Sequence, residues 1–270
     1  MLLPVSGLRV LFRSPDGSDD LAILEAAGNA IERALAVLPR LVLETQQSVE
    51  GQGQGQDSRF WEALTVTDFE AALLGLRRSL FGDSVTCLYR DPGHACEVRM
   101  EVEFSVAALL EQAQPRVRGG VRAIESEPGW YGMATKEGAM LRFRLPSVGD
   151  QLQVMGESRA AALLIERCLN GGAAGGRLPA RVERAMEALA PAISQPLQGY
   201  CPECRQALTI PLHVPQLVMD ELCDRATGVH AEIDQIASAY HWQEAVILAM
   251  PQSRRKAYAE IILKRQRSAE

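Results

Sequence analysis

The segment Cys96–Leu110, with the sequence CEVRMEVEFSVAALL, decides how this chain is organised, because a second copy follows it. Cys204–Val218, CRQALTIPLHVPQLV, aligns with it without a gap, each residue 108 positions from its partner (204 − 96). Apolar positions match apolar positions, and the alternation in both copies predicts a strand. An internal repeat describes the architecture of the whole chain. A chance likeness of two amphipathic segments is the alternative.

A second pair of similar segments lies upstream. Phe12–Pro15 (FRSP) resembles Phe143–Pro146 (FRLP), and Asp19–Leu21 resembles Asp150–Leu152. The sequence IER occurs at 31–33 and again at 165–167. Each copy therefore has the same order of strand, helix, cysteine pair, strand and helix. The interval from proline to cysteine is 81 residues in the first copy (96 − 15) and 58 in the second (204 − 146), so the first copy contains insertions.

This order predicts a helix-rich α+β fold built from two degenerate related halves and a helical C-terminal extension. The first half covers residues 1–125 and carries a flexible Gly- and Gln-rich insertion near 48–58, whose composition cannot repay the cost of ordering. The second half, with its Cys-x-x-Cys, covers 138–222. Residues 223–270 form the extension.

Local signals place the helices. Ser18, Asp19 and Asp20 are typical caps for a helix from about Leu21 to Leu43. Thr67–Glu70 fits a capping box, with a helix to Leu80 that Gly82 ends. Further helices are predicted at about 151–169, 179–189, 216–240 and 242–249, and a last one opens at Pro251.

Composition excludes several classes of protein. A chain of 270 residues that is 47% hydrophobic is long and apolar enough to fold. No run of about 18 apolar residues occurs and no basic flank precedes the N-terminal apolar residues, so we expect no membrane span, no secretory signal and a cytoplasmic location. The net charge of −6 argues against general nucleic-acid binding. The basic residues of the tail, 254–256 and 264–267, favour a solvated helix face over a nucleic-acid contact.

The cysteines predict a structural zinc ion as one of three interpretations. Cys201 and Cys204 have the spacing of a zinc-ribbon knuckle, in which two thiolates two residues apart meet one ion. The repeat points to Cys87 and Cys96 as the second pair, across a loop with Pro-Gly at its tip, and His94 is a substitute ligand for either thiol.

Two other interpretations remain open. A thioredoxin-like redox pair needs a helix N-terminus to lower the thiol pKa, whereas a strand pattern follows Cys204. Alternatively the metal site has decayed, and the cysteines pack as small apolar groups. Cys168 and Cys223 lie on predicted helices and are most simply interpreted as core residues.

No catalytic constellation emerges, so we expect a protein that is not an enzyme. The sequence contains no dinucleotide-binding glycine pattern after a strand, no phosphate-binding loop ending in Gly-Lys-Ser/Thr, and no Gly-x-Ser-x-Gly elbow. The four histidines share no ligand spacing. A binding or assembly protein is the natural interpretation.

Several segments together resemble the T4-type baseplate proteins of contractile phage tails and related injection systems. They are Leu8–Asp20 (LRVLFRSPDGSDD), Leu80–Asp83 (LFGD), the Cys201–Cys204 pair before a strand, and Ala239–Pro251 (AYHWQEAVILAMP) with Arg254, Arg255 and Tyr258. That family has a compact Cys-x-x-Cys in both halves, from which this chain departs at Cys87 and Cys96.

The resemblance implies a component or assembly factor of the baseplate hub, which contacts other baseplate or hub, tube or spike proteins. From the net charge and the lack of a long apolar run, we expect no nucleic-acid or membrane partner. The C-terminal helices would then be the contact element, with Trp242 and Tyr258 as aromatic anchors. The alternative for these two residues is packing of the short helix against its neighbour. The alternative function is a zinc-ribbon adaptor that binds a partner in transcription or protein quality control.

Overall fold

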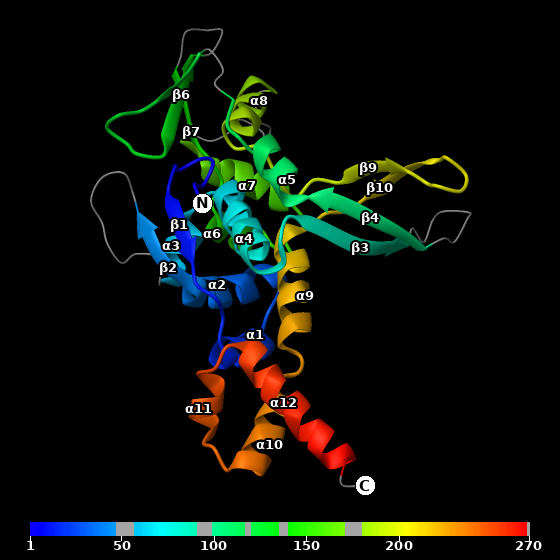
Figure 1. Cartoon of the computed structure of the whole chain (residues 1–270). Helices are drawn as coiled ribbons and strands as arrows, with labels where there is room; N and C mark the ends of the chain where they lie inside the picture. The colour runs from blue at the N-terminus through cyan, green and yellow to red at the C-terminus, as the bar shows by residue number, and fades with distance from the viewer. Residues whose placement is uncertain (47–56, 91–98, 117–119, 135–139, 171–179, 269–270) are drawn as a thin grey trace.

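The structure is a computed structural model, and it describes residues 1–46, 57–90, 99–116, 120–134, 140–170 and 180–268. It has the helix-rich α+β fold that the sequence predicts, with small antiparallel sheets (Figure 1). The first half consists of β1 (Arg9–Phe12), α1 (Gly17–Glu25), α2 (Ala30–Leu41), β2 (Val42–Gln46), α3 (Ser58–Ala63), α4 (Val66–Phe81), β3 (Ser84–Arg90), β4 (Arg99–Ser105) and α5 (Val106–Gln112).

The second half repeats much of this order. It consists of β5 (Val121–Ala123), β6 (Trp130–Ala134), β7 (Met140–Arg144), α6 (Val148–Val154), α7 (Ala160–Cys168), β8 (Leu169–Asn170), α8 (Ala180–Leu189), β9 (Leu197–Tyr200), β10 (Ala207–Ile210) and α9 (Val214–Ala226). The C-terminal arm follows, and it consists of α10 (Val229–Tyr240), α11 (Glu244–Leu248) and α12 (Gln252–Arg267).

Each half contains the same strand–helix–helix–strand unit. Unit 1 is β1–α1–α2–β2, and unit 2 is β7–α6–α7–β8. In unit 1 the last strand pairs antiparallel with the first so that Phe12 lies opposite Val42, and in unit 2 Phe143 lies opposite Leu169. An arginine at the end of the first strand, or directly after it, donates two hydrogen bonds to an aspartate in the first helical turn. The pairs are Arg13 with Asp19 and Arg144 with Asp150.

The strand pairing corrects one part of the expected alignment. Because Val42 and Leu169 occupy equivalent positions, the equivalent of Arg167 is Arg40 and not Arg33 of the IER match. The contacts agree with this register, since Arg40 lies 3.4 Å from Asp19 and Arg167 lies 3.1 Å from Asp150. Both units therefore hold their aspartate between two guanidinium groups.

The segment that defines the repeat folds the same way in both halves. β4 leads directly into α5, and β10 leads within a few residues into α9. α5 begins at Val106 and α9 at Val214, again 108 residues apart (214 − 106), and both valines are fully buried. The two copies thus place equivalent helix starts in the core.

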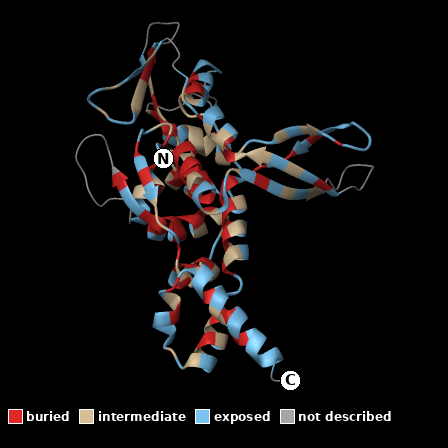
Figure 2. Ribbon diagram, in the orientation of Figure 1, coloured by how far each residue is buried: buried red, intermediate tan, exposed pale blue. Residues whose placement is uncertain are grey.

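The largest hydrophobic cluster contains residues from both halves, so the halves share a core. Figure 2 shows this buried centre around α2, α4 and α9. Trp61 and Phe69 from the first half and Met219 from the second are among its fully buried members. A separate cluster lies under the four-stranded sheet β5–β6–β7–β8. The expected boundary at 125 lies between β5 and β6, which pair in one sheet, and the one at 222 lies inside α9.

Three predicted helices are in fact pairs of shorter helices. The helix expected from Leu21 to Leu43 breaks before Asn29, whose side chain caps α2 in a capping box. The one expected at 151–169 is divided into α6 and α7, and the one at 216–240 breaks at Thr227–Gly228. The Gly- and Gln-rich insertion lies almost wholly outside the described residues.

The capping box expected at Thr67–Glu70 is wrong. The N-cap of α4 is Thr65, whose hydroxyl accepts a hydrogen bond from the Asp68 amide. Thr67 and Glu70 instead bind the loop that follows α8. The Thr67 hydroxyl donates to the Pro191 carbonyl, and the Ser194 amide and hydroxyl donate to the Glu70 carboxylate. The predicted end is right, since Gly82 terminates the helix at a φ of 89°.

Candidate functional site

Two parts of the molecule extend from the shared core (Figure 1). One is the hairpin arm, formed by β3–β4 and β9–β10. The other is the C-terminal arm, α10–α12. The sequence-predicted metal ligands lie in the hairpin arm, and the predicted partner contacts lie in the C-terminal arm.

The two hairpins of the hairpin arm pack against each other. Tyr89 and Met100 from the first hairpin form a small apolar cluster with Cys201 and Leu208 from the second. The Tyr89 hydroxyl lies 3.4 Å from the Thr209 carbonyl oxygen. The inner faces of both hairpins are therefore joined by side chains that alternate along their strands.

Cys201 and Cys204 lie on one tight turn between β9 and β10. The Cys201 amide donates to the Gln206 carbonyl, and the Arg205 amide donates back to the Cys201 carbonyl at 3.0 Å. Arg205 adopts a left-handed φ of 61°, which closes the turn. Cys201 is fully buried, whereas Cys204 is exposed.

Cys87 does not join this turn. It lies in the middle of β3 opposite Val102, and the pKa of its thiol is raised first by burial and then by the charge of Glu221 on α9, near the base of the arm. Cys96 and His94 lie outside the described residues. In the described part of the chain, no three His, Cys, Asp or Glu side chains converge as ligands of one metal ion. The four-cysteine zinc set therefore stays a prediction.

The other two cysteines are integrated into helices as expected. Cys168 is buried at the end of α7, and burial raises the pKa of its thiol to about 11. Cys223 on α9 is half-buried, and its sulfur accepts a hydrogen bond from Arg33 at 2.7 Å.

In the C-terminal arm, Trp242 and Tyr258 contact each other. The Trp242 ring stacks on Tyr240 with centroids 5.1 Å apart, and Tyr258 meets both rings edge-on. All three rings cover a small core of Ile236, Ile247 and Ile262. This geometry agrees with the packing alternative for Trp242 and Tyr258, whose role as partner anchors stays a prediction.

The C-terminal arm contains a second copy of the helix pair α3–α4, which the sequence alone does not reveal. α4 and α12 both have 16 residues and begin 186 positions apart (252 − 66). The short helices before them, α3 and α11, begin at the same separation (244 − 58). Equivalent positions are buried in both helix pairs: Trp61 and Ile247, Leu64 and Met250, Phe69 and Arg255, Leu73 and Ala259, Leu76 and Ile262.

The two helix pairs also dock in the same way. Thr65, before α4, forms an isolated β-bridge with Ser147 at the start of α6. Pro251, before α12, forms the same bridge with Asp16 at the start of α1. Ser147 and Asp16 are themselves equivalent positions of units 2 and 1, since they lie 131 residues apart (147 − 16), as Arg144 and Arg13 do (144 − 13). The helix pair of the first half thus docks on unit 2, and the C-terminal pair docks on unit 1.

The contact between the C-terminal helix pair and unit 1 is ionic, whereas the contact between the first helix pair and unit 2 is apolar. Arg255 is fully buried at the position where α4 has Phe69. Its guanidinium donates to Glu232 at 2.9 Å, to the Met250 carbonyl at 2.7 Å, and to Asp20. Asp20 is fully buried and also accepts from Arg225 of α9. Asp20, which the sequence suggests as a helix cap, is instead the centre of a buried charge cluster.

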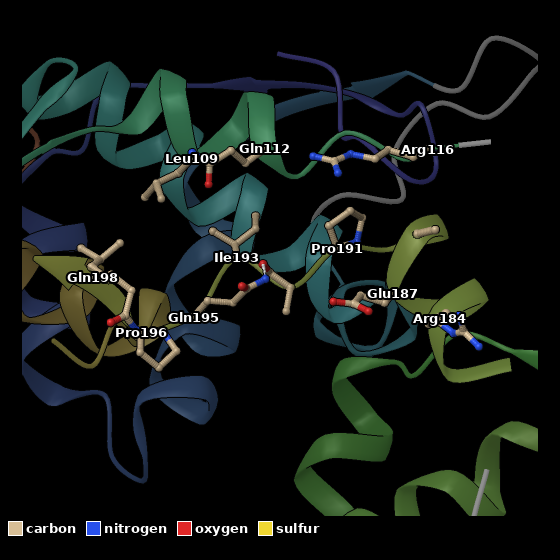
Figure 3. A pocket seen from close by; sticks show the side chains of 13 residues that line it. Leu109, Gln112, Arg116, Arg184, Glu187, Pro191, Ile193, Gln195, Pro196 and Gln198 are labelled. Carbon is tan, nitrogen blue, oxygen red and sulfur yellow. Dashed lines mark hydrogen bonds between the residues drawn. The ribbon is translucent and has the colours of Figure 1, made fainter. Parts of the chain in front are cut away.

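A pocket of about 510 Å³ lies between α5, α8 and the loop 191–198 (Figure 3). Its polar lining includes Arg116, Arg184 and Glu187, and its apolar lining includes Leu109 and Ile193. None of the sequence-predicted site residues lines it. We assign no ligand to this pocket.

Among the residues that the structure describes, every helix is too short or too polar to cross a bilayer. A comparison of the chain with protein-family models, with curated proteins and with solved structures finds no match.

Proposed function

We propose that the protein is a structural or assembly protein of a phage-like contractile tail baseplate or hub, and that it acts without catalysis, through protein–protein contacts. Its partners would be other baseplate or hub proteins, tube proteins or spike proteins, met in the cytoplasm where the tail is built. The resemblance in the sequence suggests this class, and one structural contrast supports the mode of action.

That contrast lies between two equivalent helices. On α4, the face formed by Thr67, Glu70, Ala71, Leu74 and Arg77 is buried against the rest of the molecule. The equivalent residues of α12 are Ser253, Lys256, Ala257, Glu260 and Leu263, and all of them are exposed (Figure 2). The same helix pair is therefore enclosed once and left open once.

An open copy of an enclosed helix is what an assembly protein would offer to a neighbour. The exposed apolar residues of the C-terminal arm include Val246, Ile261 and Leu263, and exposed apolar groups that lie close together favour protein contacts. The contrast between α4 and α12 does not involve Trp242 and Tyr258, whose rings cover the arm's own core. The supporting observation is thus the uncovered face of α12.

A zinc-ribbon adaptor for a cellular partner is the second candidate. The tight turn at Cys201–Cys204 supports it, because both cysteines of the knuckle belong to one closed loop at the end of the hairpin arm. That function requires bound zinc, whereas the baseplate function does not.

The test is affinity purification of the tagged full-length chain from its own host, followed by mass spectrometry and metal analysis of the eluate. Recovery of baseplate, tube or spike proteins would support the first proposal. Recovery of polymerase, protease or chaperone components with stoichiometric zinc would replace it with the adaptor. A tagged chain truncated after Thr227, which lacks the C-terminal arm, serves as the matched control, and tail proteins should be depleted from its eluate.

A further inference from the structure

We propose that the open face of α12 binds an acidic amphipathic helix of a partner protein, in the manner in which α9 covers α4. This inference rests on the proposed function and adds the chemistry of the contact. The argument uses α4 as an internal template, because both helices have the same length, the same preceding short helix and the same docking bridge.

The template shows what covers such a helix. On α4, Arg77 donates to both carboxylate oxygens of Glu221 on α9, at 2.8 and 3.0 Å. The loop after α8 covers the adjacent part of the face through Glu70, which accepts from Ser194, and Thr67. Ala71 and Leu74 lie between these polar contacts and are fully buried. A helix with an acidic group beside apolar residues therefore encloses α4 together with a loop.

The open face of α12 has a matching mixture of groups. Lys264 follows Ala257 of the open face at i+7 and so lies on the same side of the helix, and Ile261, which is 42% exposed, lies at the edge of the face. Leu263 is 38% exposed at the position of Arg77. Around the helix, Lys256, Glu260 and Lys264 lie between Leu263 on one side and Ala257 on the other, so a partner helix meets ammonium groups with apolar groups beside them.

Charge selects an acidic partner. α12 contains six basic residues and one acidic residue, Glu260, which gives a net charge of +5 (6 − 1). The whole chain carries −6, so the remainder carries −11 (−6 − 5). Arg255 is paired within the buried cluster, and the other five basic side chains of α12 are exposed. A basic helix on an acidic body attracts a negatively charged segment and orients it toward this one face.

Among the helices that the structure describes, a second copy of the chain offers no acidic helix with a free apolar face of this kind. Its acidic helix with the best match is α9, which carries Asp220, Glu221 and Asp224. The apolar face of α9, with Val218, Met219 and Leu222, is already buried in the shared core. We therefore expect the acidic helix to come from a different protein.

The experiment places a photo-crosslinking amino acid at Ala257 of the full-length tagged chain, produced in its own host. Adducts are digested and the crosslinked partner peptide is sequenced by mass spectrometry. We expect a peptide rich in Asp and Glu with apolar residues at helical spacing. Reversing two charges, with Lys256→Glu and Lys264→Glu, should reduce the adduct about tenfold, because these two ammonium groups face the carboxylates of the partner and set encounter and register.

Arg265→Glu is the matched control, since it reverses a charge on the same helix about 100° around from Lys264. We expect it to change the adduct by less than about twofold, with all variants equally helical by circular dichroism. The inference is overturned by an adduct that the Lys256 and Lys264 reversals leave intact, by a peptide that is not acidic or comes from a second copy, or by the absence of any adduct.

The same samples separate this inference from the proposed function. If tail proteins copurify but Ala257 forms no adduct with an acidic helix, the proposed function stands and the α12 contact is wrong. If an acidic helix is crosslinked but belongs to a protein outside any tail, the contact stands and the baseplate assignment fails.

Discussion

Arg255 is the residue that joins the C-terminal arm to the body. It links α12 to Asp20 of unit 1 and to Glu232 of α10, and all three side chains are buried. The carboxylates of Asp20 and Glu232 pair with the guanidinium groups of Arg225 and Arg255. Buried charges are tolerated when they are paired in this way. Removing one partner leaves an uncompensated charge in the interior.

We therefore predict that Arg255→Ala destabilises the docking of the C-terminal arm by about 3–5 kcal/mol. The measurement is urea unfolding followed by tryptophan fluorescence, which combines Trp242 of the arm with Trp61 and Trp130 of the body, together with limited proteolysis, which reports on the arm itself. Arg254→Ala is the control, because Arg254 is exposed and only lies over the Tyr258 ring at 5.9 Å. Equal losses in both variants would contradict a role for the buried cluster.

Asp150 makes unit 2 sensitive to acid. Burial by itself would raise the pKa of this carboxyl, but hydrogen bonds from Arg144, Ser147 and Arg167 outweigh burial and hold the pKa well below its usual range. A depressed carboxyl pKa contributes stability that is fully present above the unfolded pKa of about 3.9 and is lost as the pH falls toward the folded value.

We predict that the melting temperature of the native chain falls between about pH 5 and pH 2, and that Asp150→Asn is less stable at pH 7 with a shallower fall over that window. Thermal unfolding by circular dichroism across this range is the measurement. Glu157→Gln, an exposed position shortly after α6, should retain the native slope. An Asp150→Asn profile parallel to the native one would refute this account.

At the scale of elements, the hairpin arm tests the zinc hypothesis. The four-cysteine hypothesis treats Cys87 and Cys201 alike, whereas the structure places them differently. Cys201 is buried between the hairpins with Met100 and Leu208, and Cys87 is half-buried in the middle of β3.

We predict that Cys201→Ser destabilises the hairpin arm more than Cys87→Ser, by about 1–3 kcal/mol, because a hydroxyl replaces a thiol in a closed apolar cluster. Hydrogen exchange of β9 and β10 measures the effect. Zinc content of both purified variants completes the test. Equal loss of zinc from Cys87→Ser and Cys201→Ser would instead support a four-cysteine site that includes Cys87.

At the scale of the whole molecule, the C-terminal arm and the body have separate cores. The body's main cluster contains no residue beyond Ala226 among those described, and the arm has its own cluster around Ile236 and Ile262. The arm meets the body chiefly at α1, through the Asp16–Pro251 bridge and the buried charges.

We predict that a chain truncated after Thr227 still folds, with a melting temperature lowered by less than about 10 °C, because Asp20 keeps Arg225 as its partner while the Arg255 contacts are lost. Thermal unfolding and size-exclusion chromatography test this. An unfolded or aggregated product would mean that the arm belongs to the body's cooperative core.

The sequence by itself determined the features whose causes are local. The repeat of CEVRMEVEFSVAALL was visible because equivalent helix starts, at Val106 and Val214, need apolar residues at the same spacing. The match of Phe12–Pro15 with Phe143–Pro146 was visible because an arginine at the strand end pairs with an aspartate six residues later in both units. The last helix was visible from Pro251.

Only the tertiary structure decided what depends on distant contacts. Thr67 and Glu70 fit a local cap, yet they bind a loop about 124 residues away because that loop reaches α4 in three dimensions. The likeness of α3–α4 and α11–α12 left no motif, since Phe69 and Arg255 fill equivalent sites with opposite chemistry. Each site needs only a side chain that suits its own surroundings, apolar in one joint and carboxylate-lined in the other. For that reason the sequence indicates a duplicated α+β chain, and the tertiary structure alone identifies the open face of α12.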